Sequence, residues 1–199
     1  MIDEMKRLKR ELMYKGAILD IYKDTMQFAN GTTEEWDFVS HRKGAAAVLP
    51  VLPDGRVILV RQYRNALERE TLELPAGCRD SLDEDTKLTA ARELEEETGY
   101  HSDQISFLLS LRTTVAFCDE FVDVYLAENL VPGEQHLDDS ESIDVEIYSL
   151  DEVCEMIYAG KMQDSKTVAA ILAYSNKVNR REIVIFENSW TYSLLNSGR

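Results

Sequence analysis

The pattern of apolar and polar positions predicts β-strands through most of the first half of the chain. Extended runs that are mainly apolar or alternating cover residues 18–28, 35–40, 45–52, 56–61 and 71–74. Asn30-Gly31 lies between the first two runs and favours a tight hairpin turn. We therefore expect residues 1–42 to form an antiparallel β-hairpin extension at the N-terminus.

The second half combines helical and extended patterns. A helix is expected over residues 85–98, where Gly99 suits the C-terminal cap. The other expected elements are strands at 105–112, 121–127 and 144–148, a polar loop at 131–142, and helices at 150–158 and 165–176. This order predicts an α+β fold over residues 43–180, with a mixed β-sheet sandwiched between helices. The tail, residues 181–199, is expected to be either an edge strand at 183–186 or partly disordered.

The charge balance narrows the class of partner. The chain has 199 residues, and its 37 acidic residues exceed its 22 basic ones, giving a net charge of −15. Nucleic acids bind clustered Lys and Arg, so we expect no nucleic-acid partner. No apolar run approaches the roughly 18 residues of a membrane span, and the charged N-terminal segment does not read as a secretion signal. We therefore expect a cytoplasmic protein that does not bind membranes.

Three glutamates in the expected central helix are the first candidates for chemistry. Glu93, Glu96 and Glu97 stand at i, i+3 and i+4, so they project from one helix face. Oxygen ligands alone select a hard cation, Mg²⁺ or alternatively Mn²⁺. Arg92 is placed to pair with Glu96 one turn along, and a solvated acidic face is the alternative interpretation. The opposite side is expected to pack on the sheet through Leu88, Ala91 and Leu94.

The surroundings of these glutamates resemble the signature of the Nudix hydrolases. A strand ending in Leu-Pro-Ala-Gly precedes a loop, an acidic residue and the string Arg-Glu-Leu-Glu-Glu-Glu-Thr-Gly. The matching positions are Gly77, Glu84, Arg92, Glu93, Leu94, Glu96, Glu97 and Gly99. Six residues separate Gly77 from Glu84 where the family has five, so either Asp83 or Glu84 fills the position of the loop acid.

The flanking residues resemble one branch of this family, the ADP-ribose and nucleotide-sugar pyrophosphatases. The resemblance rests on Arg61-Gln62-Tyr63-Arg64 and on Leu72-Glu73-Leu74-Pro75-Ala76-Gly77. It implies a Nudix fold and metal ligands at Glu93, Glu96, Glu97 and the carbonyl of Ala76. It also implies a homodimer in which the N-terminal strands help to build the partner's site. Val115 stands where ADP-ribose hydrolases of the branch usually carry a proline. The resemblance therefore supports the assignment to the branch more strongly than the assignment of ADP-ribose as the substrate.

Several further residues are candidates for contacts with substrate. Trp36 is a candidate for stacking on a nucleobase or, equally, a tryptophan of a core or dimer interface. Arg61 or Arg64 is expected to grip a phosphate, with a surface ion pair as the alternative. Phe117 and Glu120 match residues of the branch.

A general base is expected in the acidic loop before the last strand. Glu141 is the candidate, with Asp139 and Asp144 as alternatives and a flexible surface loop as the competing interpretation. Arg92, Glu96 and Glu97 complete the expected catalytic group.

The resemblance implies magnesium-dependent hydrolysis of ADP-ribose or a related nucleoside diphosphate sugar. The expected products are a nucleoside monophosphate and a sugar phosphate. Three alternatives stay open: another diphosphate substrate (a UDP- or GDP-sugar, a dinucleotide or a flavin nucleotide), a non-catalytic ADP-ribose sensor, and an acidic structural protein.

Overall fold

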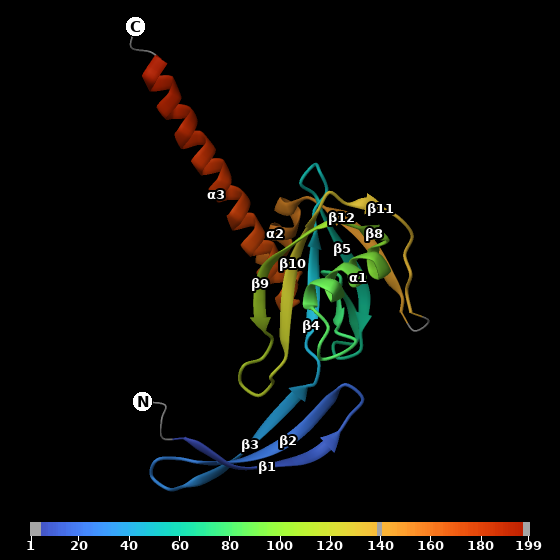
Figure 1. Ribbon diagram of the computed structural model, residues 1–199, viewed down its shortest axis with the longest axis vertical. Helices are drawn as coiled ribbons and strands as arrows, with labels where there is room; N and C mark the ends of the chain where they lie inside the picture. Colours follow the sequence, from blue (N-terminus) through green and yellow to red (C-terminus); the bar gives the residue numbers. More distant parts are fainter. Residues whose placement is uncertain (1–4, 139–140, 197–199) are drawn as a thin grey trace.

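The computed structural model describes residues 5–138 and 141–196, and its N-terminal sheet lies apart from the main body (Figure 1). The sheet is antiparallel with the order β1-β2-β3, formed by β1 Lys6–Lys15, β2 Leu19–Gln27 and β3 Thr33–His41. Its β2–β3 turn is the predicted one, because Gly31 has φ 81° and donates its N–H to the carbonyl of Phe28 at 2.9 Å. The sequence pattern did not predict β1, whose side chains are almost all exposed and which therefore lacks an apolar face.

Two further sheets form the body of the domain. The first has the order β7-β4-β10-β9, with β4 Ala45–Pro50, β7 Ala76–Cys78, β9 Gln104–Arg112 and β10 Phe121–Glu128. Only its β4–β10 pair is parallel, so the sheet is mixed. The second is antiparallel with the order β12-β5-β6, formed by β5 Val57–Arg64, β6 Arg69–Glu73 and β12 Ile143–Tyr148. In a short antiparallel pair, β8 Tyr100–His101 joins β11 Val131–Pro132, which lies at the start of the predicted loop.

The central strand β4 is buried on both faces, which explains its continuous apolar run. Ala46 and Val48 belong to a cluster that includes Ala90 and Leu94 of helix α1, Thr86–Thr98. Leu49, on the other face, packs in the cluster that the C-terminal helices complete. The predicted α+β fold with a mixed sheet between helices is therefore confirmed.

Helix α1 begins and ends where capping residues predict. The Asp85 side chain accepts a hydrogen bond from the Lys87 N–H, and Gly99 adopts φ 73° while its N–H reaches the carbonyl of Glu95. The expectation that Leu88 packs on the sheet is wrong. Leu88 is 63% exposed, because the buried face of the helix passes through Ala90 and Leu94, four residues apart.

Two helices follow the last strand, α2 Leu150–Tyr158 and α3 Ser165–Asn196. A capping box of Ser149 and Glu152 begins α2. The suggested edge strand at 183–186 is wrong, since this segment is part of α3, and the far half of that helix projects away from the domain (Figure 1). None of the helices in the described ranges is both long and apolar enough to cross a membrane.

Candidate active site

The entrance to the site is a close contact between strand β7 and helix α1. A Cβ atom at Gly77 would lie 2.1 Å from Oε1 of Glu93, so any side chain there would displace the glutamate. Gly77 thus leaves room for the Glu93 carboxylate in its present position, which gives a physical reason for the glycine that opens the signature. Within the loop that follows, Glu84 is folded inward and accepts a hydrogen bond from the Asp80 N–H, while Asp83 is exposed.

Arg92 organises the carboxylates as the helical spacing predicted. Its Nη1 donates to Oε1 of Glu93 and to Oε2 of Glu96, both at 2.8 Å. Its Nη2 donates to the carbonyl of Cys78 at 3.1 Å, which ties the helix to the end of β7. The predicted pair between Arg92 and Glu96 is confirmed.

Glu97 faces inward from the next position of the same helix. It is 4% exposed, and its Oε2 accepts a hydrogen bond from the Ala76 N–H at 3.1 Å. Burial raises the pKa of Glu97 to about 8, and the charges of Glu93 and Glu141 act in the same direction. Burial likewise raises the pKa of Glu93 to about 7, with Arg92 opposing it and Glu96 adding to it. Two carboxyl groups are therefore held where their ionised forms are disfavoured.

The donor set fits a divalent cation. Among the described residues no trio of His, Cys, Asp and Glu side chains is already gathered around one point, because the glutamates are turned toward Arg92 and the Ala76 N–H. Their oxygens nevertheless share one end of α1, and a cation there would offset the cost of ionising two buried acids. Glu93, Glu96, Glu97 and the Ala76 carbonyl are the atoms available to hold it.

These raised pKa values predict that the stabilising effect of metal depends on pH. The metal-free fold is favoured by protonated Glu93 and Glu97, so this stability is complete below the ordinary value of 4.5 and is lost as the pH rises toward 7 and 8. A Mg²⁺ ion bound to the ionised carboxylates is expected to restore this stability. The rise in unfolding temperature on replacing EDTA with Mg²⁺ is expected to be larger at about pH 8.5 than at about pH 5.5. An equal rise at both pH values would contradict a metal site at these two residues.

The predicted base, Glu141, is exposed and lies two residues before β12. Its Oε2 accepts from the Asp138 N–H at 3.1 Å, and its own N–H donates to the Asp138 carbonyl at 2.9 Å. Its charge raises the pKa of both Glu93 and Glu97, so Glu141 lies close enough to the cluster for its charge to act on it. The alternative base Asp139 lies outside the described residues.

The two arginine candidates lie on opposite faces of β5, because side chains alternate along a strand. Arg61 donates through Nε and Nη2 to the carboxylate of Glu146 and is held in that pair. Arg64 instead lines a pocket of about 360 Å³ together with Ala76, Gly77 and Glu120. The structure thus brings Arg64 and Glu120 to Ala76 and Gly77, the segment we call the metal loop because the Ala76 carbonyl is an expected metal ligand. Arg61 lies on the other face of β5 and does not line this pocket.

Phe117 and Trp36 belong to a second region, where the N-terminal sheet meets the domain. The Phe117 carbonyl accepts from the Val39 N–H of β3 at 2.7 Å, and Asp119 binds Ser40 and the His41 N–H. Trp36 lies three residues before Val39 in β3 and is 42% exposed. Its ring packs edge-on against the ring of Phe28, with 6.1 Å between the ring centres. Within one chain, therefore, Trp36 is not part of the pocket beside Gly77.

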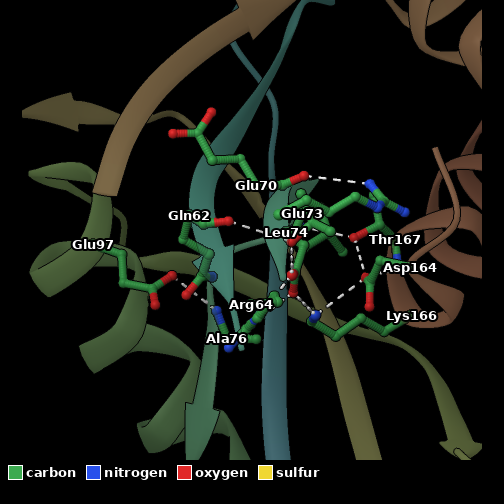
Figure 2. A network of polar contacts seen from close by, with 12 residues as sticks. Gln62, Arg64, Glu70, Glu73, Leu74, Ala76, Glu97, Asp164, Lys166 and Thr167 are labelled. Atoms are coloured by element: carbon green, nitrogen blue, oxygen red, sulfur yellow. Dashed lines mark hydrogen bonds and ion pairs between the residues drawn. The ribbon is translucent and has the colours of Figure 1, made fainter. Parts of the chain in front are cut away.

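A polar network behind Arg64 was not expected from the sequence. Figure 2 shows it extending from Arg64 through Glu73 of β6 to Lys166 and Asp164 at the start of α3. The available signal was Glu73 itself, a charged residue between two leucines, Leu72 and Leu74.

Comparisons with known proteins agree with this geometry. The model of the NUDIX domain matches residues 41–171, more than half of the chain. The chain therefore belongs to the Nudix hydrolase family.

Curated relatives match over most of both chains. A methanol dehydrogenase activator of Bacillus methanolicus is 37% identical over 170 residues, 84% of this chain and 91% of the relative. An ADP-ribose pyrophosphatase of Bacillus subtilis is 35% identical with the same coverage. One of Mycobacterium tuberculosis is 32% identical over 172 residues, 85% of this chain and 83% of the relative. A crystal structure of an ADP compounds hydrolase superposes with a TM-score of 0.80, covering 89% of this chain and 96% of that one, and at 20% identity it shows the fold alone.

Proposed function

We propose that this protein hydrolyses the diphosphate bond of ADP-ribose or a related nucleoside diphosphate sugar with Mg²⁺, or alternatively Mn²⁺, releasing a nucleoside monophosphate and a sugar phosphate. The observation that carries the proposal is the cluster of Glu93, Glu96 and Glu97 beside Ala76, whose N–H Glu97 binds. Ala76 also lines the pocket that Arg64 lines. The similarity to ADP-ribose pyrophosphatases supports the choice of substrate.

Each residue of the cluster has a role in this reaction. A bound Mg²⁺ supplies neutralisation of the diphosphate charge and a more acidic water. Glu93, Glu96, Glu97 and the Ala76 carbonyl hold the cation, and Arg92 keeps Glu93 and Glu96 in place. Glu141 acts as the general base that takes the proton of the attacking water. The other residues act by positioning the diphosphate and stabilising its charge, on which phosphoryl transfer mainly depends.

A substrate panel tests the proposal. Purified protein with Mg²⁺ or Mn²⁺ is expected to convert ADP-ribose to AMP and ribose 5-phosphate at least about tenfold more efficiently, in kcat/KM, than UDP-glucose, GDP-mannose, a dinucleotide or FAD. EDTA should abolish turnover. A higher kcat/KM for another compound would move the substrate assignment within the family, and binding of ADP-ribose without turnover would favour a sensor.

We also propose that residues 1–42 form the dimerising extension of a catalytic domain at 43–180. The N-terminal sheet exposes Leu12, Met13, Tyr14 and Trp36, each more than 40%, and an apolar surface of this kind favours association. In such a dimer Trp36 would be free to stack on the base of the partner's substrate. Sedimentation is expected to give about twice the chain mass of 22.8 kDa, and a monomer would contradict the dimer.

A further inference from the structure

A buried carboxylate that the reaction scheme does not use lies behind the wall of the pocket. Glu73 ends β6 and is 3% exposed. Its Oε1 accepts from Arg64 Nε at 2.7 Å and from Thr71 Oγ1 at 2.6 Å, and its Oε2 accepts from Arg64 Nη2 at 2.7 Å and from Lys166 Nζ (Figure 2). Burial alone would raise the pKa of Glu73, but the hydrogen bonds and charges of Arg64 and Lys166 lower it to about 2. The carboxylate is therefore charged and saturated with donors.

The bonds to Glu73 fix the orientation of the Arg64 guanidinium. A guanidinium carries five N–H donors in one plane, and Glu73 engages only the edge formed by Nε and Nη2. No contact within the described chain engages Nη1. The opposite edge is thus left to a ligand in the pocket, and its paired donors match two phosphate oxygens.

The same carboxylate is fastened to helix α3. Lys166 bridges Glu73 and Asp164, and Asp164 accepts hydrogen bonds from the N–H and hydroxyl of Thr167. The Thr167 hydroxyl in turn accepts from the Leu74 N–H at 2.8 Å. Residues 74–76 are therefore fixed at both ends. Thr167 of α3 binds the Leu74 N–H, and Glu97 of α1 binds the Ala76 N–H.

Stability alone is a weak explanation for this arrangement. Removing charged groups from water is costly, and well-packed apolar residues often stabilise a core as well as a buried ion pair does. What an apolar residue at position 73 cannot do is orient a guanidinium beside the metal loop.

We propose that Glu73 is a positioning residue, which holds Arg64 with its free edge toward the pocket so that it binds a phosphate oxygen of the substrate. The proposal rests on the proposed function, because it needs a diphosphate at the metal loop. Glu73 does not touch substrate, so its effect must act through Arg64.

A double-mutant cycle separates positioning from stability. Arg64→Ala and Glu73→Gln are each expected to raise KM for ADP-ribose by about tenfold or more, the usual effect of losing a hydrogen bond to a charged group. The double variant is expected to resemble Arg64→Ala within about twofold, because Glu73 has nothing left to position. Effects on KM that multiply in the double variant would overturn the proposal.

Glu146→Gln is the matched control. It breaks the other bidentate pair of β5, with Arg61 on the opposite face, and is expected to lower the unfolding temperature while leaving KM unchanged. If Glu73→Gln behaves in the same way, Glu73 is only structural. Glu73→Asp keeps the buried charge in case Glu73→Gln does not fold, and it is expected to restore KM to within about threefold of wild type. A folded Glu73→Asp with the KM of Arg64→Ala would argue against positioning.

A second measurement keeps this test independent of the proposed activity. In ¹⁵N spectra of arginine side chains, assigned by the signal missing from Arg64→Ala, the Arg64 Nε–H is expected to be protected from exchange in wild type, to lose protection in Glu73→Gln and to keep most of it in Glu73→Asp. Inorganic pyrophosphate with Mg²⁺ should shift the wild-type signal. If wild type binds pyrophosphate here but hydrolyses no diphosphate, the proposed function fails and the positioning role stands. Unchanged protection in folded Glu73→Gln would overturn the positioning role whatever the activity.

Discussion

Glu97→Gln is expected to remove almost all turnover while leaving the fold intact. Glu97 is buried against the Ala76 N–H, and an amide oxygen still accepts that hydrogen bond. The amide binds Mg²⁺ far more weakly than a carboxylate does. Metal stabilisation is worth several kcal/mol, so kcat should fall by roughly 10²- to 10³-fold at saturating Mg²⁺.

The stability of this variant should change in the opposite direction from its activity. Burial raises the pKa of Glu97 to about 8, so the metal-free wild type is penalised near neutral pH for holding this acid. In EDTA the variant should therefore unfold at the same temperature as wild type or higher, and it should gain less from Mg²⁺. Glu95→Gln makes the same charge change at an exposed position of α1 and should leave both properties unaltered. Turnover of Glu97→Gln within about tenfold of wild type would exclude Glu97 as an essential metal ligand.

Local signals were sufficient to predict helix α1. Its C-terminal cap at Gly99 and the Arg92–Glu96 pair each depend on residues within one or two turns, and both are confirmed. The role of Gly77 is also local, because Glu93, whose carboxylate it leaves room for, lies on the next element along the chain, helix α1. A motif of this kind is visible because its parts are close together in the chain.

Contacts between distant segments were not visible in the sequence. The run Arg61-Gln62-Tyr63-Arg64 shows that its two arginines are on opposite faces of one strand, but not which face meets the metal loop. That depends on pairing of β5 with β6 and β12, which sets Glu73 beside Arg64 and Glu146 beside Arg61. Lys166, which completes the network, is 93 residues from Glu73.

Strand β1 was missed for a different reason. A strand is recognised by an apolar face, and β1 has charged residues along both sides with its few apolar side chains exposed. Its pairing with β2 and the ion pair of Arg10 with Asp24 order it instead. In the proposed dimer, a second copy of the chain would cover the exposed apolar side chains of β1.

Glu141→Gln is expected to lower kcat by roughly 10²- to 10⁴-fold with little change in KM, the effect of losing a general base. The carboxylate accepts a hydrogen bond from the Asp138 N–H and lies close enough to Glu93 and Glu97 for its charge to act on them, yet Glu141 itself is exposed. The variant should therefore unfold at the wild-type temperature. In the pH–rate profile, the decline in wild-type rate at acid pH should be lost. Glu134→Gln, an exposed glutamate in the same loop, is the matched control and should retain full activity.

The pattern of kinetic changes distinguishes a role of Glu141 as general base from a role as metal ligand. If Glu141 took part in holding the cation, raising the Mg²⁺ concentration would rescue its variant, and the pH profile would keep its shape. A base cannot be replaced in that way, because the proton still has no acceptor near the attacking water. Should Glu141→Gln keep both kcat and its pH dependence, Asp144, three residues farther along and in β12, is the next candidate, and Asp144→Asn should then carry the loss.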